Sequence, residues 1–272
     1  MAEILEIRDV SLRFGGVRAL THVSLAVKQG ELFSVIGPNG AGKTSLLNCI
    51  SGRYRPTEGH VVYRGEDITR RRTADRAKLG IGRTFQNLAL FQHMSVLDNI
   101  MVGRHHLLGN NFLTGSIYWL TGARTEELAH RRRVEEIIDF LDLQAVRKAP
   151  AGTLSYGLRK RVELARAMAI EPALILLDEP MAGMNLEEKE DIARYIIDLN
   201  EEFGMTVIMI EHDMGVVMDI SHRVAVLDFG RKIAEGSPEE VLADAHVRAA
   251  YLGEEDELLT DPDEPPLVEA TS

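Results

Sequence analysis

The sequence predicts an α/β fold in which a helix-covered parallel sheet is interrupted by a helical segment. After about residue 170, apolar strand-like runs alternate with a helical pattern, which is typical of a parallel sheet covered on both faces. Between about residues 94 and 170, apolar side chains instead recur at helical spacing. A chain of 272 residues, 45% hydrophobic and 27% charged, is large enough for one big domain or two small ones.

The elements of this fold follow one another in a definite order. Short strand-like runs separated by turns come first and are expected to form the edge of a mixed sheet. In the helical segment, one apolar stripe is typical of core packing. After this helical segment, a strand, a helix and two more strands follow in the sequence and are expected to complete the sheet. The expected strands are 4–14, 23–27, 31–37, 59–65, 173–179, 206–212 and 223–230, the helix is 186–202, and the stripe consists of Val134, Ile137, Ile138 and Leu141.

Composition argues against several classes of protein. One cysteine cannot form an internal disulfide, and the first residues lack a basic region followed by an apolar stretch, so we expect a cytoplasmic protein. Apolar runs such as 173–177 are far shorter than the ~20 residues of a spanning helix, so membrane association would require a partner. The net charge of −11 argues against broad nucleic-acid binding. Residues 253–272 hold eight acids and no base, which predicts a disordered tail.

The strongest local signal is a phosphate-binding loop. Residues 37–45, GPNGAGKTS, match the pattern G-x-x-x-x-G-K-[ST] between an expected strand and an expected helix. The glycines allow the backbone to wrap a diphosphate, Lys43 supplies a positive charge, and the Thr44 hydroxyl can ligate Mg²⁺. We therefore predict that the nucleotide is bound by Asn39, Gly40, Ala41, Gly42, Lys43, Thr44 and Ser45.

Polar residues after three other apolar runs predict ATP hydrolysis. Asp178 and Glu179 close one strand, so that Asp178 would lie near Mg²⁺ and Glu179 could polarise water at the γ-phosphate. A kinase has little use for such a glutamate, and the sequence lacks the base-specific N-K-x-D loop of a GTPase. His212 ends another strand at the same sheet edge and would lie beside Glu179. The Gln86 amide can reach both Mg²⁺ and the attacking water.

A further feature, LSYGL at 154–158, opens a charged helix. The N–H groups at a helix N-terminus suit a phosphate, so Ser155 and Gly157 are candidates for such a contact. The alternative is that Ser155 only caps its helix. The apolar side chains of this helix share one face, and its other faces carry the basic residues Arg159, Lys160, Arg161 and Arg166.

Together these motifs resemble the ATP-binding-cassette (ABC) ATPase family over about residues 3–252. The resemblance implies an ABC ATPase domain at 1–252, followed by the acidic tail. It would comprise a RecA-like P-loop nucleotide-binding core with an antiparallel β subdomain, at about 1–87 and 171–252, and an inserted helical subdomain at about 88–170. The matching motifs are the Walker A loop (37–45), the Q-loop glutamine (Gln86), the signature (154–158), the Walker B strand (174–179) and the switch histidine (His212).

The resemblance also implies a head-to-tail dimer, in which Ser155, Tyr156 and Gly157 of one chain act on ATP held by the Walker A loop of its partner. Phe14 matches the aromatic residue that stacks on adenine, and Ala19 would lie nearby. The alternative is that Phe14 belongs to the core of the first sheet.

Two departures from the family pattern affect the signature and the D-loop. Tyr156 and Leu158 stand in place of a glycine and the glutamine of L-S-G-G-Q. The D-loop ends in Asn185, where an acid is common. We expect catalysis to survive both departures, whereas they put the coupling across the dimer in question.

Within the family, the stretches RTFQN, YG, AGMN, EHDM and YLGE resemble the ATPases of branched-chain amino-acid importers. So does the long stretch 104–124, whose apolar cluster around Trp119 is either local core or a surface for a membrane subunit. The resemblance implies an ATPase that uses ATP and Mg²⁺ at the cytoplasmic face of the inner membrane and serves an importer of amino acids or similar small polar solutes.

The resemblance implies several partners. They are a second cassette, identical or related, two integral membrane permease subunits and, indirectly, an external solute-binding protein. Leu88, Leu90 and Phe91 would line the groove that receives a permease helix. No nucleic acid is expected as a partner.

Three alternative functions stay open. A lipopolysaccharide-export ATPase shares YLGE but is similar only without so long an insertion. A soluble ABC ATPase acting on ribosomes or DNA would carry two cassettes, a coiled coil or a basic arm, and its only support is the basic clusters 70–72 and 131–133. A non-catalytic binding subunit is opposed by the presence of Lys43, Glu179 and His212.

Overall fold

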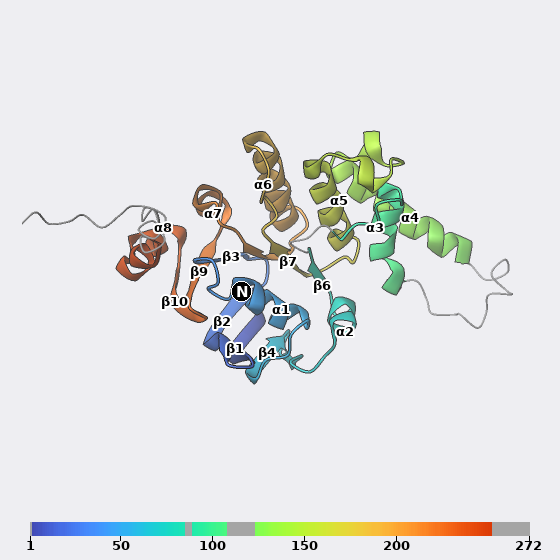
Figure 1. The fold of residues 1–272 in the computed structure, drawn as a ribbon. Coiled ribbons are helices and arrows are strands. Elements are labelled where there is room, and N and C mark those ends of the chain that lie inside the picture. The colour runs from blue at the N-terminus through green and yellow to red at the C-terminus, as the bar shows by residue number, and fades with distance from the viewer. Residues whose placement is uncertain (1, 85–88, 108–122, 252–272) are drawn as a thin grey trace, which may run out of the picture.

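The computed structural model describes residues 2–84, 89–107 and 123–251, which form two sheets with helix α1 (Lys43–Ser51) between them (Figure 1). α1 begins at Lys43, directly after the glycine-rich loop that follows strand β3 (Leu32–Ile36). The phosphate-loop pattern therefore predicted both the position and the start of this helix.

The first sheet is antiparallel, with the strand order β2-β1-β4-β5. The expectation that the early runs form the edge of one mixed sheet is wrong, because β1 pairs with β2 on one side and with β4 on the other, which closes them into a sheet of their own. Only the run at 31–37 joins the second sheet. The four strands are β1 (Glu3–Phe14), β2 (Val17–Lys28), β4 (Glu58–Tyr63) and β5 (Glu66–Asp67).

The second sheet has the strand order β10-β9-β3-β8-β7-β6. Its strands are parallel except for β10, which pairs antiparallel with β9. The carboxyl ends of the parallel strands therefore meet at one edge, where ligands of open α/β sheets bind. Besides β3, the strands are β6 (Ile81–Arg83), β7 (Leu174–Asp178), β8 (Thr206–Ile210), β9 (Arg223–Asp228) and β10 (Arg231–Gly236).

Both faces of this parallel sheet are buried. Successive side chains of a strand point to opposite faces, and in β3 Phe33 and Val35 pack with α1 and the antiparallel sheet, while Leu32 and Ile36 pack with the helices of the other face. The expected helix at 186–202 is confirmed as α6. Besides α1, the helices of the core are α2 (Thr73–Lys78), α6 (Leu186–Glu201), α7 (Met214–Ile220) and α8 (Pro238–Ala243).

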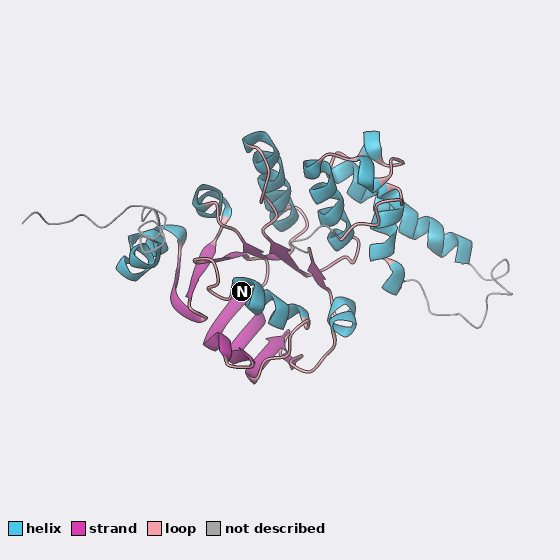
Figure 2. Ribbon diagram, viewed as in Figure 1, coloured by secondary structure: helices cyan, strands magenta, loops and turns pink. Residues whose placement is uncertain are grey.

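The segment between the strands β6 and β7 is helical and gathers at one end of the molecule (Figure 2). The predicted stripe is confirmed as core, because Val134, Ile137, Ile138 and Leu141 are all buried. Within the described part of the chain, no helix has the length and apolar character needed to cross a membrane. The segment contains α3 (Val96–Gly103), α4 (Ala123–Phe140), α5 (Tyr156–Met168) and short 3₁₀ turns at His105–Leu107, Gln144–Val146 and Ala151–Thr153.

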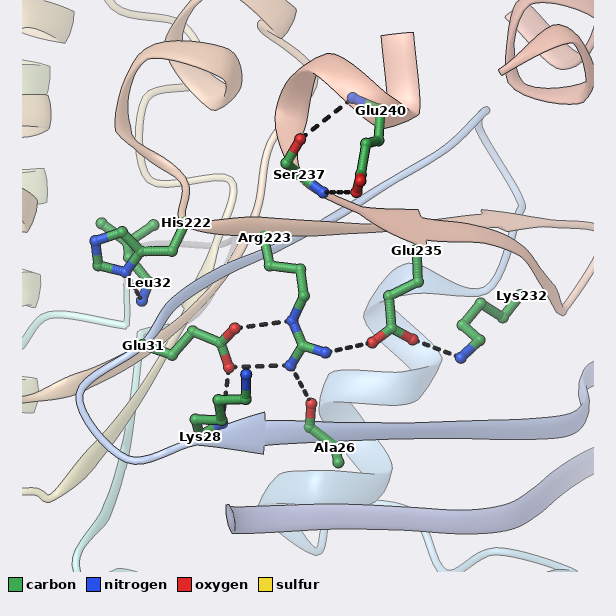
Figure 3. A network of polar contacts seen from close by, with 10 residues as sticks. All are labelled: Ala26, Lys28, Glu31, Leu32, His222, Arg223, Lys232, Glu235, Ser237 and Glu240. Carbon is green, nitrogen blue, oxygen red and sulfur yellow. Dashed lines mark hydrogen bonds and ion pairs between the residues drawn. The ribbon is translucent and has the colours of Figure 1, made fainter. Parts of the chain in front are cut away.

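A partly buried ion-pair network joins the two sheets, as Figure 3 shows. Arg223 at the start of β9 donates to both carboxylate oxygens of Glu31, at 2.8 and 3.0 Å, and to Glu235 on β10 at 2.6 Å. The same guanidinium also donates to the carbonyl oxygen of Ala26 on β2, at 2.5 Å. The planar, multidentate guanidinium suits this position, since one group must satisfy acceptors from two strands and a turn.

Candidate nucleotide site

The glycine-rich loop is held against the neighbouring strands so closely that side chains are excluded. Gly42 has φ 98°, and a Cβ there would lie 2.5 Å from the carbonyl oxygen of Ala19 on β2. A Cβ at Gly37 would lie 2.0 Å from the carbonyl oxygen of Leu227 on β9. Ala19 thus contacts the loop through its backbone. The loop is a rigid cradle at the N-terminus of α1, where N–H groups and the helix dipole favour an anion.

Lys43 is folded back onto this loop. Its Nζ donates to the carbonyl oxygens of Gly37 and Pro38, at 2.5 and 2.8 Å, and the residue is 5% exposed. These carbonyl contacts hold the ammonium group within the cradle, at the position where phosphate oxygens would compete for it.

Asp178, the last residue of β7, connects the loop to a second charged group. Its Oδ1 accepts from the Thr44 hydroxyl at 3.4 Å, and its Oδ2 accepts from the Arg83 guanidinium at 3.0 Å. Asp178 is 1% exposed, and burial raises the pKa of its carboxyl above 3.8 although Arg83 opposes this. A hydroxyl and a carboxylate oxygen at this separation are the hard ligands that Mg²⁺ prefers, so the site fits that ion.

Glu179 and His212 come together at the carboxyl ends of adjacent strands. Asp178 on β7 is paired with Ile210 on β8, so the residues that follow leave the sheet side by side. His212 Nε2 and Glu179 Oε1 are 2.9 Å apart. The Glu179 side chain is 16% exposed and that of His212 is 42% exposed, so both can reach a ligand from the sheet edge.

Comparison with known proteins agrees with this geometry. A family model described as "ABC transporter" matches residues 20–182, and BraF of Pseudomonas aeruginosa, a "high-affinity branched-chain amino acid transport ATP-binding protein", is 39% identical over 92% of this chain and 98% of its own length. The chain belongs to the ABC transporter family. It is accordingly an ABC-type ATPase.

Other relatives agree with the assignment to the ABC family. LivG of Escherichia coli, with the same description as BraF, is 36% identical over 92% of this chain and 98% of its own length. A second family model, "Branched-chain amino acid ATP-binding cassette transporter", matches residues 231–257. Among solved structures, an ABC-transporter cassette in its ADP conformation has a TM-score of 0.81 at 34% identity, covering 93% of this chain and 100% of its own. A dimeric cassette bound to ADP and Pi has a TM-score of 0.71 at 27% identity, and the match covers 86% of this chain and 98% of that cassette.

The ABC signature opens α5, as expected, and Ser155 does cap this helix. The Ser155 hydroxyl accepts from the N–H of Leu158 at 3.4 Å, while Ser155 itself is exposed. α5 packs on the sheet face opposite to α1. Within one chain the signature and the Walker A loop therefore lie on different sides of the sheet. Because Ser155 stays exposed while it caps α5, its side chain is accessible to another molecule.

Gly157 and Asn185 both lie against Glu188, at the cap of α6. Asn185 caps α6, accepting from the N–H of Glu188 at 2.9 Å, while the Glu188 carboxylate accepts from the Asn185 N–H at 3.3 Å. Asparagine and aspartate are equally good N-caps, so the D-loop departure preserves this cap. A Cβ at Gly157 would lie 2.4 Å from the Glu188 carboxylate, so a larger residue at position 157 would require the Glu188 side chain to move away from the α6 cap.

Phe14 does not lie in the core of the first sheet. It is 45% exposed, and its ring packs edge-on against Tyr54, with the centroids 5.0 Å apart. An accessible ring at the end of β1 is compatible with stacking on a base, so the adenine contact stays a prediction. Gln86, Leu88 and Trp119 lie outside the described residues, whereas Leu90 is buried and Phe91 is 52% exposed.

Three of the four basic residues named on α5 bind within the chain. Lys160 is 5% exposed, and its Nζ donates to the Glu179 carbonyl oxygen at 3.3 Å. Arg161 pairs with Asp191 on α6, and Arg166 donates to the Ala89 carbonyl oxygen at 2.5 Å. Lys160 and Arg161 thus connect α5 to the core, at the residue after β7 and at α6, whereas Arg166 binds within the helical segment itself.

Three charged residues of the site were missed by sequence reasoning. Arg83 binds Asp178 and also reaches α1, through Asn48 and Ser51 at 2.8 and 2.6 Å. Glu211, 3% exposed, accepts from the N–H groups of Met181 and His212 at 2.8 and 3.1 Å. Lys160 is the third. Arg83 lies in the stretch RTFQN and Lys160 on the charged helix after the signature, but neither pattern indicated a partner, whereas the position of Glu211 next to His212 at a strand end could have indicated its role.

Proposed function

We propose that this chain is the ATP-hydrolysing subunit of a membrane importer for branched-chain amino acids or similar small polar solutes. The carboxylate–imidazole pair of Glu179 and His212, beside the Walker A loop, supports hydrolysis. The printed functions of BraF and LivG, which align over nearly their whole length, support the importer. The match at residues 231–257 to a branched-chain amino-acid cassette family supports the same solute class.

In the proposed reaction, the chain's own residues bind ATP and position water. The loop N–H groups and Lys43 hold the β- and γ-phosphates. Thr44 and Asp178, together with Gln86, would hold Mg²⁺, which neutralises phosphate charge when it is bound. Glu179 accepts a proton from the attacking water, and the His212 N–H that lies at this carboxylate without nucleotide would turn to donate to the γ-phosphate when ATP is bound.

The proposed assembly places a second cassette, identical or related, head-to-tail against this one. Ser155, Tyr156 and Gly157 would then cover the ATP of the partner chain, and Asn185 would lie at the D-loop of the interface. Phe14 would stack on adenine near Ala19. Two permease subunits would anchor the pair at the cytoplasmic face of the plasma membrane, with a solute-binding protein on the other side. Neither lipopolysaccharide export nor action on ribosomes or DNA receives support from the relatives named above.

Co-purification tests this proposal directly. The tagged chain is isolated from its own cells in mild detergent, with an untagged strain as the control, and co-purifying proteins are identified by mass spectrometry. We expect two multi-spanning subunits, with or without a second cassette. Uptake of labelled leucine by the same cells should be lost when the chain carries Glu179→Gln and kept with Glu201→Gln, a change on the exposed end of α6. Ribosomal or DNA-repair proteins without a membrane subunit would contradict the importer.

A further inference from the structure

A cavity of about 290 Å³ lies away from the nucleotide site, where α4 meets the core. Its wall is formed by side chains of α4, of the end of α5 and the α5–β7 connection, and of the α6–β8 connection. These two connections enter β7 and β8 at their amino ends, whereas Asp178 and His212 follow the carboxyl ends of the same strands. The cavity and the nucleotide site are therefore on opposite edges of the sheet. The lining residues are Arg133, Glu136, Ile137, Phe140, Met168, Glu171, Pro172, Phe203 and Met205.

One part of the cavity wall is apolar and adaptable. Ile137, Met168 and Met205 are buried there, and methionine side chains accommodate irregular ligand shapes. Phe140 and Phe203 contact each other edge-on, with ring centroids 5.0 Å apart, and Phe203 is 40% exposed. This wall presents apolar and aromatic surface to whatever enters the cavity, as is typical of small-molecule sites.

The other part of the wall carries both signs of charge. Arg133 lies between two carboxylates, donating to Glu136 at 2.6 Å and to Glu171 at 3.1 Å. The side chains of Arg133, Glu136 and Glu171 are 39, 52 and 47% exposed, so an incoming ligand can exchange with these pairs. The buried guanidinium of Arg104 also donates to Glu171, at 3.1 Å. Arg104 does not line the cavity, but with it the four charged groups sum to zero, which favours a ligand that is itself neutral overall but carries both charges.

We propose that this cavity binds an α-amino acid with an apolar side chain. The carboxylate would pair with the Arg133 guanidinium, which recognises carboxylates with two parallel hydrogen bonds. The ammonium group would pair with Glu136 or Glu171, and the side chain would enter the wall of methionine and phenylalanine. The volume corresponds to about ten water molecules at ~30 Å³ each, which is room for a molecule the size of leucine.

The choice of a branched-chain amino acid as the occupant rests on the proposed function, whereas the site itself rests on the cavity. Binding to the chain alone is independent of any permease, so the two proposals can fail separately. Co-purification tests the importer, and the binding experiment below tests the cavity.

The experiment is isothermal titration of the purified full-length chain with L-leucine, in the absence of nucleotide. Saturable binding is expected, with an affinity that falls at least about tenfold for leucinamide, which lacks the carboxylate, and for 4-methylpentanoate, which lacks the ammonium group. Arg133→Gln should lower leucine affinity about tenfold or more. Arg132→Gln, the same change at the neighbouring exposed residue that does not line the cavity, should leave it unaltered.

A second readout locates the ligand and does not depend on the stability of the Arg133 variant. Phe203→Trp places a fluorophore in the wall of the cavity, and its emission should change on addition of leucine with the same midpoint as the titration. Equal binding of leucinamide or 4-methylpentanoate, absence of saturable binding at about 10 mM leucine, or binding that leaves the emission of the Phe203→Trp variant unaltered would each overturn the proposal.

Discussion

Glu179 is held by its backbone as well as by its side chain. Its φ of 51° lies in the left-handed region, which for a residue other than glycine costs about 1–3 kcal/mol and persists only where the surroundings impose it. The surroundings here are the hydrogen bonds of its N–H to Ile210, of its carbonyl oxygen to Lys160 and of its carboxylate to His212. Such strain is typical of active sites, and it fixes the direction of the carboxylate that we assign as the base.

Glu179→Gln tests that assignment. The amide keeps the size of the side chain and cannot accept a proton from water, so we expect ATP hydrolysis to fall about 10²- to 10⁴-fold. Nucleotide affinity should be kept, because the loop and Lys43 are unaltered. Hydrolysis is measured by phosphate release and affinity with a fluorescent ATP analogue, and Glu201→Gln is the matched control. A variant that hydrolyses ATP at the normal rate would show that another group is the base.

The burial of the Glu211 carboxyl leads us to expect that the stability of the fold depends on pH. Burial raises the pKa of its carboxyl above 4.5, so the folded chain binds this proton at a higher pH than the unfolded chain does. The charged form therefore lowers stability at neutral pH, and this penalty disappears as the pH falls through the raised pKa. Glu211→Gln is uncharged throughout and provides the reference.

The measurement for Glu211 is thermal unfolding of the wild type and of Glu211→Gln between pH 8 and pH 5. We expect the wild type to gain stability relative to the variant as the pH falls, because only the wild type takes up a proton there. Glu201→Gln, at an exposed position, should show no such trend. A difference between wild type and Glu211→Gln that stays constant across this range would contradict the prediction.

At the scale of elements, Arg223 is the main polar connection between the two sheets. Replacing it by methionine keeps an unbranched apolar stem but leaves Glu31, whose side chain is 9% exposed, without its cation. Breaking a fully buried pair in this way costs about 3–5 kcal/mol, and because Arg223 is 24% exposed we expect a smaller loss, about 2–3 kcal/mol.

Urea unfolding measures the Arg223→Met loss. Lys232→Met removes a cation from the exposed end of the same network, where surface pairs are worth about 0–1 kcal/mol, and it is the matched control. Adding Glu31→Gln to Arg223→Met should recover part of the loss, since it removes the uncompensated charge. Equal effects of Arg223→Met and Lys232→Met would show that the network does not join the sheets energetically.

Some helices and strands could be predicted from the sequence, and others could not. α1 and α6 begin where expected, because their starts are encoded locally by the glycine-rich loop and by the Asn185 cap. The strand pattern alone assigned the early strands to the edge of a mixed sheet, since strand pairing depends on partners such as Ser11 and Glu58 that lie far apart in sequence, whereas the family resemblance correctly implied an antiparallel β subdomain. Arg83 and Lys160 were missed for the same reason, as their acceptors Asp178 and Glu179 come from distant segments.

For the whole molecule, the two faces of the parallel sheet determine how a complete ATP site can form. α1 and the Walker A loop belong to one face, and α5 with the signature belongs to the other. Ser155 and Lys43 of one chain are therefore expected to act in different sites. A two-fold dimer would bring each signature to the loop of the opposite chain, and both sites would then be made from two chains.

Mixing two inactive variants tests this arrangement. Lys43→Ala removes a phosphate contact, and Ser155→Asp keeps the α5 cap, since aspartate is as good an N-cap as serine, while placing a negative charge against the partner's γ-phosphate. Each variant alone should hydrolyse ATP poorly. In a dimer of one Lys43→Ala chain and one Ser155→Asp chain, one site contains both changes and the other contains neither.

Random pairing makes about half of the dimers mixed, and each mixed dimer has one unaltered site of two, so an equal mixture should recover about one quarter of the wild-type ATPase activity. Ser237→Asp adds the same charge at the cap of α8 and should stay active on its own, which separates the effect of position from that of charge. Activity of the mixture that equals the average of the two separate variants would mean that the signature of this chain does not complete the ATP site of an identical partner. The expected recovery requires Ser155 and Lys43 to meet across two chains, because no single chain in the mixture has both residues unaltered.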